Sequence, residues 1–160
     1  MKVYKITIAI VFAILIMLLL ILPAKGEDYD CWILCQPDSW VNARENPTKK
    51  SMELGRLDCG DHVYTDGVTK NGFLHVWGLS FEFNEGWVHK GYVVYSEPYR
   101  PYVYDTTIQS NGRVQARKTI NGARRCWLRD GDKIRVYMVS SEWSVTNKGF
   151  VKTEYIDLGR

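Results

Sequence analysis

The stretch Gly86-Trp87-Val88-His89-Lys90-Gly91-Tyr92-Val93 decides how the chain is organised, because a related stretch lies near its end, Gly149-Phe150-Val151-Lys152-Thr153-Glu154-Tyr155-Ile156. In each, a glycine precedes an aromatic residue and a tyrosine follows that aromatic five residues later. Each is typical of a strand, a short turn and a second strand. The pair indicates that one structural unit is built twice.

Further matches upstream occur in the same order in both halves. They are Gln36–Arg44 with Gln109–Arg117, Gly60-Asp61 with Gly131-Asp132, and Leu74-His75-Val76 with Trp143-Ser144-Val145. Tyr92-Val93 matches Tyr155-Ile156 at the end. The differences in length fall in expected turns, where insertions are tolerated. The sequence therefore predicts two copies of one fold.

The pattern of short strands predicts an all-β class. No window of helical periodicity follows residue 26, short apolar–polar alternations such as Trp40–Arg44 recur, and Asn71-Gly72 is a strong hairpin signal. Small barrels or sandwiches fit this pattern. The prolines at 98 and 101 predict a short, stiff linker over 98–101, between a first copy at 27–97 and a second at 102–160.

The N-terminal segment is a targeting sequence. Residues 6–22 are uncharged with Thr7 the only polar side chain, and Lys2 and Lys5 precede them. Two alternatives remain open: a signal peptide over 1–26 that is cleaved before Glu27, or a membrane anchor through residues 6–24. Both place residues 27–160 outside the cytoplasm, either secreted or anchored at the cell surface.

The net charge of +3 comes from this segment. Without Lys2, Lys5 and Lys25, the remaining chain has 18 basic and 18 acidic side chains. The charge balance therefore gives no reason to expect a nucleic-acid partner. A local basic cluster is interpreted as the solvated face of a sheet; it comprises Arg113, Arg117, Lys118, Arg124 and Arg125.

The ordered motifs of the first copy resemble bacterial SH3 (SH3b) domains. They are Asn42-Ala43-Arg44, Asn46-Pro47, Gly60-Asp61, Gly86-Trp87-Val88 and Tyr92. The second copy departs from the pattern, with Gln115 for Asn, Phe150 for Trp and no proline in the loop 118–122. The resemblance covers about residues 28–160 and implies two small SH3-like barrels in tandem. With the apolar N-terminal segment, the expected architecture is these two barrels after an N-terminal hydrophobic helix. It also implies binding of peptidoglycan or of an envelope protein or peptide.

Aromatic residues divide into expected core and expected ligand-binding sets. Trp87, Phe150, Tyr92 and Tyr155 could all fill the core of a small barrel, but we expect core packing for Trp87 and Phe150. The tyrosines and the longer hairpin from Trp77 to Phe83 are the better candidates for a ligand groove. Phe73, His75 and Trp77 share one face of a strand, and Phe81 and Phe83 share another. An exposed aromatic patch is a plausible ligand surface. The ligand-binding candidates are His75, Trp77, Phe81, Phe83, Tyr92 and Tyr95.

The four cysteines beyond the targeting segment suggest disulfide bonds. Cys31 and Cys35 would lie on one strand, about 13 Å apart at the usual rise, which is too far for a bond. Cys59 is the most plausible partner for either, whereas a bond from Cys126 to Cys31 or Cys35 would join the two copies. The pairing stays open at this point.

No enzymatic motif is as specific as the internal repeat. Cys59-Gly60-Asp61-His62 could contribute to a zinc site, for which Cys31 and Cys35 could supply the second pair of ligands, but an export route favours disulfides. It could also hold a thiol nucleophile, whose partners the spacing does not show. We therefore expect no catalytic residues, no metal and no cofactor. The expected function is a non-enzymatic exported binding protein. The alternative is a structural or partner-binding component of a surface, secretion, transfer or phage-encoded assembly.

Overall fold

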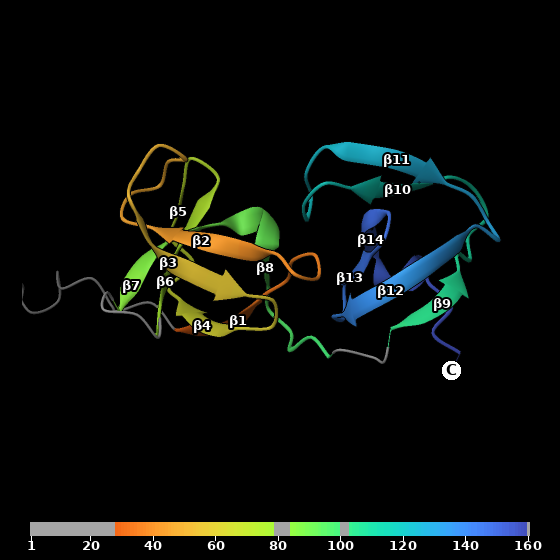
Figure 1. Cartoon of the computed structure of the whole chain (residues 1–160), viewed down its shortest axis with the longest axis horizontal. Coiled ribbons are helices and arrows are strands. Elements are labelled where there is room, and N and C mark those ends of the chain that lie inside the picture. Colours follow the sequence, from red (N-terminus) through yellow and green to blue (C-terminus); the bar gives the residue numbers. More distant parts are fainter. Residues whose placement is uncertain (1–27, 79–83, 100–102, 160) are drawn as a thin grey trace, which may run out of the picture.

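The computed structural model describes residues 28–78, 84–99 and 103–159, and these form two antiparallel β-sheets that follow one another along the chain (Figure 1). This confirms the all-β class. Within those ranges the helical elements are two 3₁₀ turns, η1 (Lys90–Tyr92) and η2 (Thr153–Tyr155). The expected N-terminal helix and the segment 1–26 lie outside the described residues. No helix of the described part is long and apolar enough to cross a membrane.

The N-terminal sheet has the strand order β3-β2-β7-β6-β4-β1-β8, with β5 paired to β6. Its strands are β1 (Tyr29–Ile33), β2 (Trp40–Arg44), β3 (Glu53–Asp58), β4 (His62–Thr65), β5 (Thr69–Lys70), β6 (Phe73–Trp77), β7 (Glu85–His89) and β8 (Val93–Val94). Alternate residues of these strands point inward, as the period of two requires. They form one core cluster that includes Cys31, Ile33, Val63, Leu74, Val76 and Val88.

The C-terminal sheet has the order β11-β10-β14-β13-β12-β9. Its strands are β9 (Tyr104–Thr107), β10 (Val114–Arg117), β11 (Arg124–Leu128), β12 (Lys133–Val139), β13 (Trp143–Thr146) and β14 (Gly149–Lys152). A second core cluster lies inside it and includes Ile108, Val114, Ala116, Ile134, Val136 and Val151. Each sheet thus buries its own apolar set.

Equivalent pairings recur in the two sheets at the positions that the internal repeat matches. Arg44 pairs with Trp87 as Arg117 pairs with Phe150, and an irregularity in register precedes each arginine. The two Gly-Asp turns are also equivalent. The Asp61 carboxylate accepts a bond from Asp58 N at 2.8 Å, and the Asp132 carboxylate accepts one from Arg129 N at 2.7 Å.

One of the expected matches is wrong by a single residue. Phe73 pairs with His89, and Trp143 pairs with Lys152. Since His89 and Lys152 each lie two residues after the repeated aromatic, Trp143 is equivalent to Phe73 and not to Leu74. Backbone pairing to the next strand sets this register, and two short apolar runs compared along the sequence do not reveal it.

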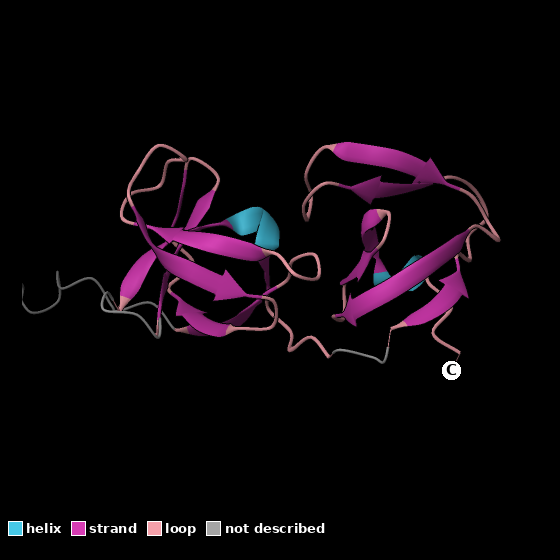
Figure 2. Ribbon diagram, viewed as in Figure 1, coloured by secondary structure: helices cyan, strands magenta, loops and turns pink. Residues whose placement is uncertain are grey.

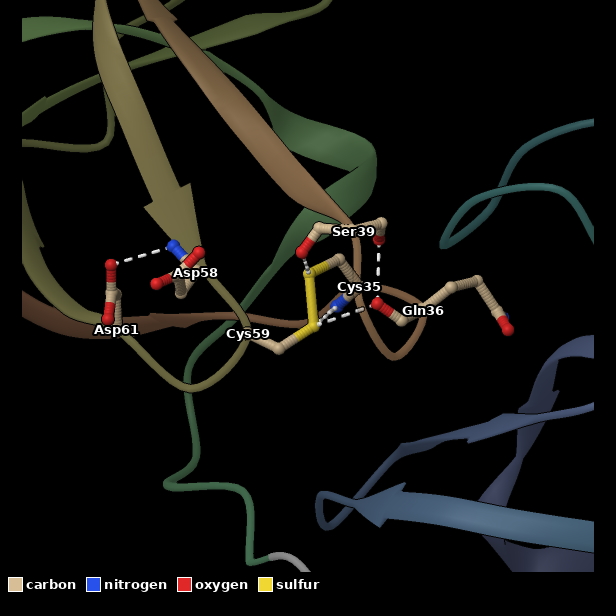
Figure 3. The surroundings of a disulfide bond; sticks show 6 residues. All are labelled: Cys35, Gln36, Ser39, Asp58, Cys59 and Asp61. Atoms are coloured by element: carbon tan, nitrogen blue, oxygen red, sulfur yellow. Dashed lines mark hydrogen bonds between the residues drawn. A yellow bond between two sulfur atoms is a disulfide. The ribbon is translucent and has the colours of Figure 1, made fainter.

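A disulfide bond joins Cys35 to Cys59, with the two Cα atoms 5.3 Å apart (Figure 3). The expectation that Cys59 bonds to Cys31 or Cys35 is therefore confirmed, and its partner is Cys35. β1 ends at Ile33, so Cys35 lies just beyond the strand rather than on it. Cys31, which is buried, and Cys126, which is half-buried, are free. The two sheets are consequently not joined by a disulfide.

A third apolar cluster lies between the two sheets. Leu34 and Val94 come from the N-terminal side, and Ile120, Met138, Trp143, Val145 and Phe150 come from the C-terminal side. Figure 2 shows the two sheets side by side with η1 on the side that faces the C-terminal sheet. The backbone N–H of Ile120 donates to Gly91 O at 2.8 Å across this boundary. The copies therefore share a hydrophobic interface.

The aromatic residues of the two repeated stretches occupy different environments. Phe150 is 1% exposed in the cluster between the sheets, and Tyr92 and Tyr155 pack partly buried against core clusters. The expectation for Trp87 is wrong: it is half-buried and points outward, because Gly86 and Val88 on either side are the residues that face inward.

In the expected linker, Tyr99 pairs with Val139 of β12.

Candidate ligand-binding face

Aromatic and histidine side chains gather on the outer face of β1, β4, β6 and β7. On these strands the inward positions hold small or aliphatic residues, so the alternate positions project away from the core. The outward rings, which we call the aromatic face, are those of Trp32, His62, Tyr64, His75, Trp77 and Trp87.

Strand register places these rings next to one another. Trp32 is the cross-strand partner of His62, Tyr64 that of Trp77, and His75 that of Trp87. Cross-strand partners on one face have Cβ atoms about 5 Å apart, within reach of aromatic rings. The aromatic face is therefore a row that crosses four strands.

Ring contacts confirm that the row is continuous over most of its length. The centroids of Trp32 and His62 are 4.9 Å apart, and those of His62 and Tyr64 are 4.7 Å apart. The His75 ring lies 6.0 Å from the Trp77 ring and 5.2 Å from the Trp87 ring. Between these groups, the Tyr64 ring lies so close to Gly78 that a Cβ there would be 2.8 Å from Tyr64 Cδ2.

Carboxylates accompany the histidines of this row. Asp30 Oδ1 lies 2.8 Å from His62 Nε2. Asp66 and Glu85 lie on either side of His75, at 3.4 Å from Nδ1 and 3.8 Å from Nε2. These carboxylates are partly or largely exposed, so they can also accept hydrogen bonds from a ligand's amines or hydroxyls.

A second row of rings leads from the sheet to the interface between the copies. Phe73 lies 5.5 Å from His89, His89 lies 5.7 Å from Tyr92, and Tyr92 lies 6.1 Å from Phe150. The pKa of His89 is lowered, first by burial and then by the nearby Lys49 and Lys90. Phe73, His89 and Tyr92 also line a groove of about 460 Å³ together with Lys118, so this row both joins the two sheets and borders solvent.

The predicted ligand-binding residues are thus only partly brought together. His75 and Trp77 lie side by side in the aromatic face. Tyr92 lies apart, against Phe150. Tyr95 is 61% exposed and lines a separate groove of about 400 Å³ with Ile120 and Trp143. Phe81 and Phe83 lie outside the described residues.

Four members of the aromatic face were not among the sequence candidates. They are Trp32, His62, Tyr64 and Trp87. The alternation His62-Val63-Tyr64-Thr65 carries the signal that would have identified two of them, since Val63 and Thr65 are buried. Trp87 was assigned to the core on the basis of its size.

The structure changes the interpretation of Cys59 and His62. The sulfur of Cys59 is bonded to Cys35, so the proposed Cys59 thiol nucleophile is not present, and His62 pairs with Asp30 instead. Over residues 28–78, 84–99 and 103–159, no group of three or more His, Cys, Asp or Glu side chains is arranged to hold a metal ion.

Comparison with known proteins gives only distant structural likenesses. No protein-family model and no curated protein matches the sequence. Among solved structures, the chain is similar to NlpC1 from Trichomonas vaginalis, with 12% identity, a TM-score of 0.37 and coverage of 82% of this chain and 46% of that one. For NlpC2 of the same organism the values are 12%, 0.36, 82% and 48%. The chain spans about half the length of these structures, and at such TM-scores the likeness carries no functional argument.

Proposed function

We propose that this chain is an exported, non-enzymatic binding protein made of two tandem SH3b-like modules. Its aromatic face recognises a ligand of the cell envelope, either peptidoglycan or an envelope protein or peptide. The first module, 27–97, carries the recognition surface, and the second, 102–160, is the more divergent copy.

The observation that supports this most directly is the row of six rings on one outer sheet face, in two groups of three contacting rings. Aromatic rings present large, rigid, apolar surfaces at a small cost in conformational entropy, which is why they are enriched where proteins bind partners. The flanking carboxylates of Asp30, Asp66 and Glu85 suit a ligand that offers amines or hydroxyl groups beside an apolar face.

Two observations support the location outside the cytoplasm. The uncharged segment over residues 6–22 follows Lys2 and Lys5, as an export signal or anchor would require. The Cys35–Cys59 disulfide is typical of proteins from oxidising compartments. An envelope ligand is consistent with both.

The experiment is retention of the purified protein on isolated peptidoglycan, with the double variant Trp77→Ala/Trp87→Ala beside the wild type. We expect the double variant to lose about a hundredfold or more in affinity, because each aromatic hot spot of a binding site contributes about 2 kcal/mol or more and about 1.4 kcal/mol is tenfold. The matched control is Trp40→Ala, which removes a tryptophan of the same sheet that is 49% exposed. Trp40 does not belong to the aromatic face, because its ring stacks under the Arg56 guanidinium. The control should bind as the wild type does.

The outcomes separate the two ligand classes. Failure of the folded wild type to bind peptidoglycan removes the wall ligand and leaves the alternative of a protein partner in a surface assembly. Equal losses in the double variant and in Trp40→Ala would contradict a specific role for the aromatic face.

A further inference from the structure

The neutral exported part of the chain is divided into two halves of opposite charge. Residues 27–97 hold twelve acidic and six basic side chains, for a net charge of −6. Residues 98–160 hold six acidic and twelve basic side chains, for a net charge of +6. The positive charge of the C-terminal half attracts anionic ligands to it.

Part of this positive charge lines a groove on the C-terminal sheet. The groove has a volume of about 460 Å³, and its lining includes Arg113, Arg117 and Lys152 together with Gln115 and Trp127. No carboxylate lines it. At its border, Glu154 Oε1 lies 3.9 Å from Lys152 Nζ, and Asp130 Oδ1 accepts a bond from Ser110 N.

The duplicated fold provides an internal comparison for Arg117. Its equivalent in the N-terminal sheet, Arg44, pairs across the strands with Glu53, and their side chains form an ion pair at 2.9 Å. The cross-strand partner of Arg117 is Arg124. The second copy therefore has two arginines where the first has an arginine and a glutamate.

The two equivalent arginines, Arg44 and Arg117, are otherwise anchored in the same way. Arg44 Nη1 donates to Ser51 O at 2.8 Å, and Arg117 Nη1 donates to Gly122 O at 2.7 Å. The Arg44 guanidinium uses Nη2 for Glu53, whereas no carboxylate of the described residues lies within ion-pair distance of Arg117. The Arg117 guanidinium is held in place with donors left for a ligand.

Like charges directly opposite one another destabilise a sheet, so this arrangement has a cost in the free protein. Arg124 lies over the Trp127 ring, 4.8 Å from its centroid, which fixes a second guanidinium beside the groove. An oxyanion between the two guanidinium groups would relieve their repulsion and form charge-assisted hydrogen bonds with both.

We propose that this groove, on β10, β11 and β14, is a second binding site and that it takes an acidic polysaccharide through carboxylate or phosphate groups. The ligand's oxyanions bind Arg113, Arg117, Arg124 and Lys152. Single-stranded nucleic acid fits less well, because besides phosphate contacts it needs exposed ring faces on which its bases stack, and one face of Trp127 is already covered by Arg124. This site does not depend on the ligand of the aromatic face.

The test is calorimetric titration of the full-length protein, in mild detergent, with polygalacturonate for carboxylates and with a phosphate-bearing polysaccharide. The informative variant is Arg124→Glu, which restores the charge pattern of Arg44 and Glu53. We expect it to bind either polymer at least tenfold more weakly, while its melting temperature equals or exceeds that of the wild type. Arg113→Ala, at an exposed position of the lining, is a second variant and should weaken binding several-fold.

The matched control is Lys148→Glu, which changes the net charge equally on the same sheet at an exposed position outside the groove lining. It should bind within about twofold of the wild type. The proposal is overturned if Arg124→Glu retains wild-type affinity, if Lys148→Glu loses as much, or if an oligo(dT) strand binds more tightly than both polysaccharides. Binding of only one of the two polymers identifies which oxyanion the site takes.

Discussion

His89 links the sheet of the first copy to the interface through two kinds of contact. Its Nδ1 accepts a hydrogen bond from Gly91 N at 3.2 Å, which caps η1, and its ring packs against Phe73 and Tyr92. Accepting this bond requires an unprotonated Nδ1. Burial, and then the charges of Lys49 and Lys90, lower the pKa of His89 below its ordinary value of 6.5.

This pKa predicts a pH dependence of stability. The unfolded chain takes up a proton on His89 as the pH falls through 6.5, while the folded chain resists it. The free energy of unfolding should therefore fall with pH from about 6.5 down to the lowered folded pKa and then level off. In His89→Asn, Oδ1 can cap η1 without titrating. Urea unfolding at several values between pH 7.5 and 5 should show a shallower slope for the variant than for the wild type, and an unchanged slope would contradict the role of His89.

At the residue scale, the sequence predicts the environments of some side chains correctly and those of others wrongly, for physical reasons. Arg44 and Arg117 were aligned correctly because each sits in a short motif with fixed spacing. Trp87 was assigned to the core because a large aromatic side chain buries much area. The alternation of its strand was the better guide, since Gly86 and Val88 already occupy the inward positions.

At the scale of elements, the approach of β14 to β10 depends on Gly149. Its φ is +119°, a conformation that favours glycine, and a Cβ there would clash with the backbone carbonyl oxygen of Arg117. The clash is with backbone, so neither a side-chain rotation nor a small shift can relieve it.

Gly149→Ala should therefore lower the free energy of unfolding by about 3 kcal/mol or more, from backbone strain together with overpacking. The matched control is Gly112→Ala, because a Cβ at Gly112 meets nothing within 4 Å and its φ is not in the left-handed region. We expect the control to stay within about 1 kcal/mol of the wild type. Chemical denaturation of both variants provides the measurement, and similar losses in the two would show that the close approach is unimportant.

The sequence predicted the existence of most strands but not all of their registers. The strand class followed from alternation and from turn signals such as Asn71-Gly72, where Asn71 adopts a φ of 52°. The one-residue error that matched Leu74 with Trp143 has a different origin. The connection between β6 and β7 is longer than the turn between β13 and β14, so the backbone pairing that fixes register could not be inferred from the apolar pattern alone.

At the scale of the whole molecule, the interface between the copies was the least predictable feature. Leu34 lies just after β1 and Ile120 lies in the loop between β10 and β11, so neither belongs to a periodic pattern. The sequence suggested a covalent link through Cys126 as one possibility, whereas the structure shows an apolar cluster. This cluster has a consequence for how the molecule unfolds.

Because the two sheets share buried apolar surface, we expect the wild type to unfold in a single cooperative transition, with equal calorimetric and van't Hoff enthalpies. Ile120 and Met138 belong to the cluster between the sheets and to neither sheet's own core. The double variant Ile120→Ala/Met138→Ala should weaken the coupling and separate the unfolding of the two copies into two transitions.

Ile134→Ala is the control, because it removes a comparable side chain from the core of the C-terminal sheet alone. It should cost about 2–5 kcal/mol and keep one transition, since the shared cluster stays intact. Two transitions in the wild type would show that the copies unfold independently despite their shared cluster. A single transition in the double variant, with the same enthalpy ratio as Ile134→Ala, would show that this cluster is not what couples them.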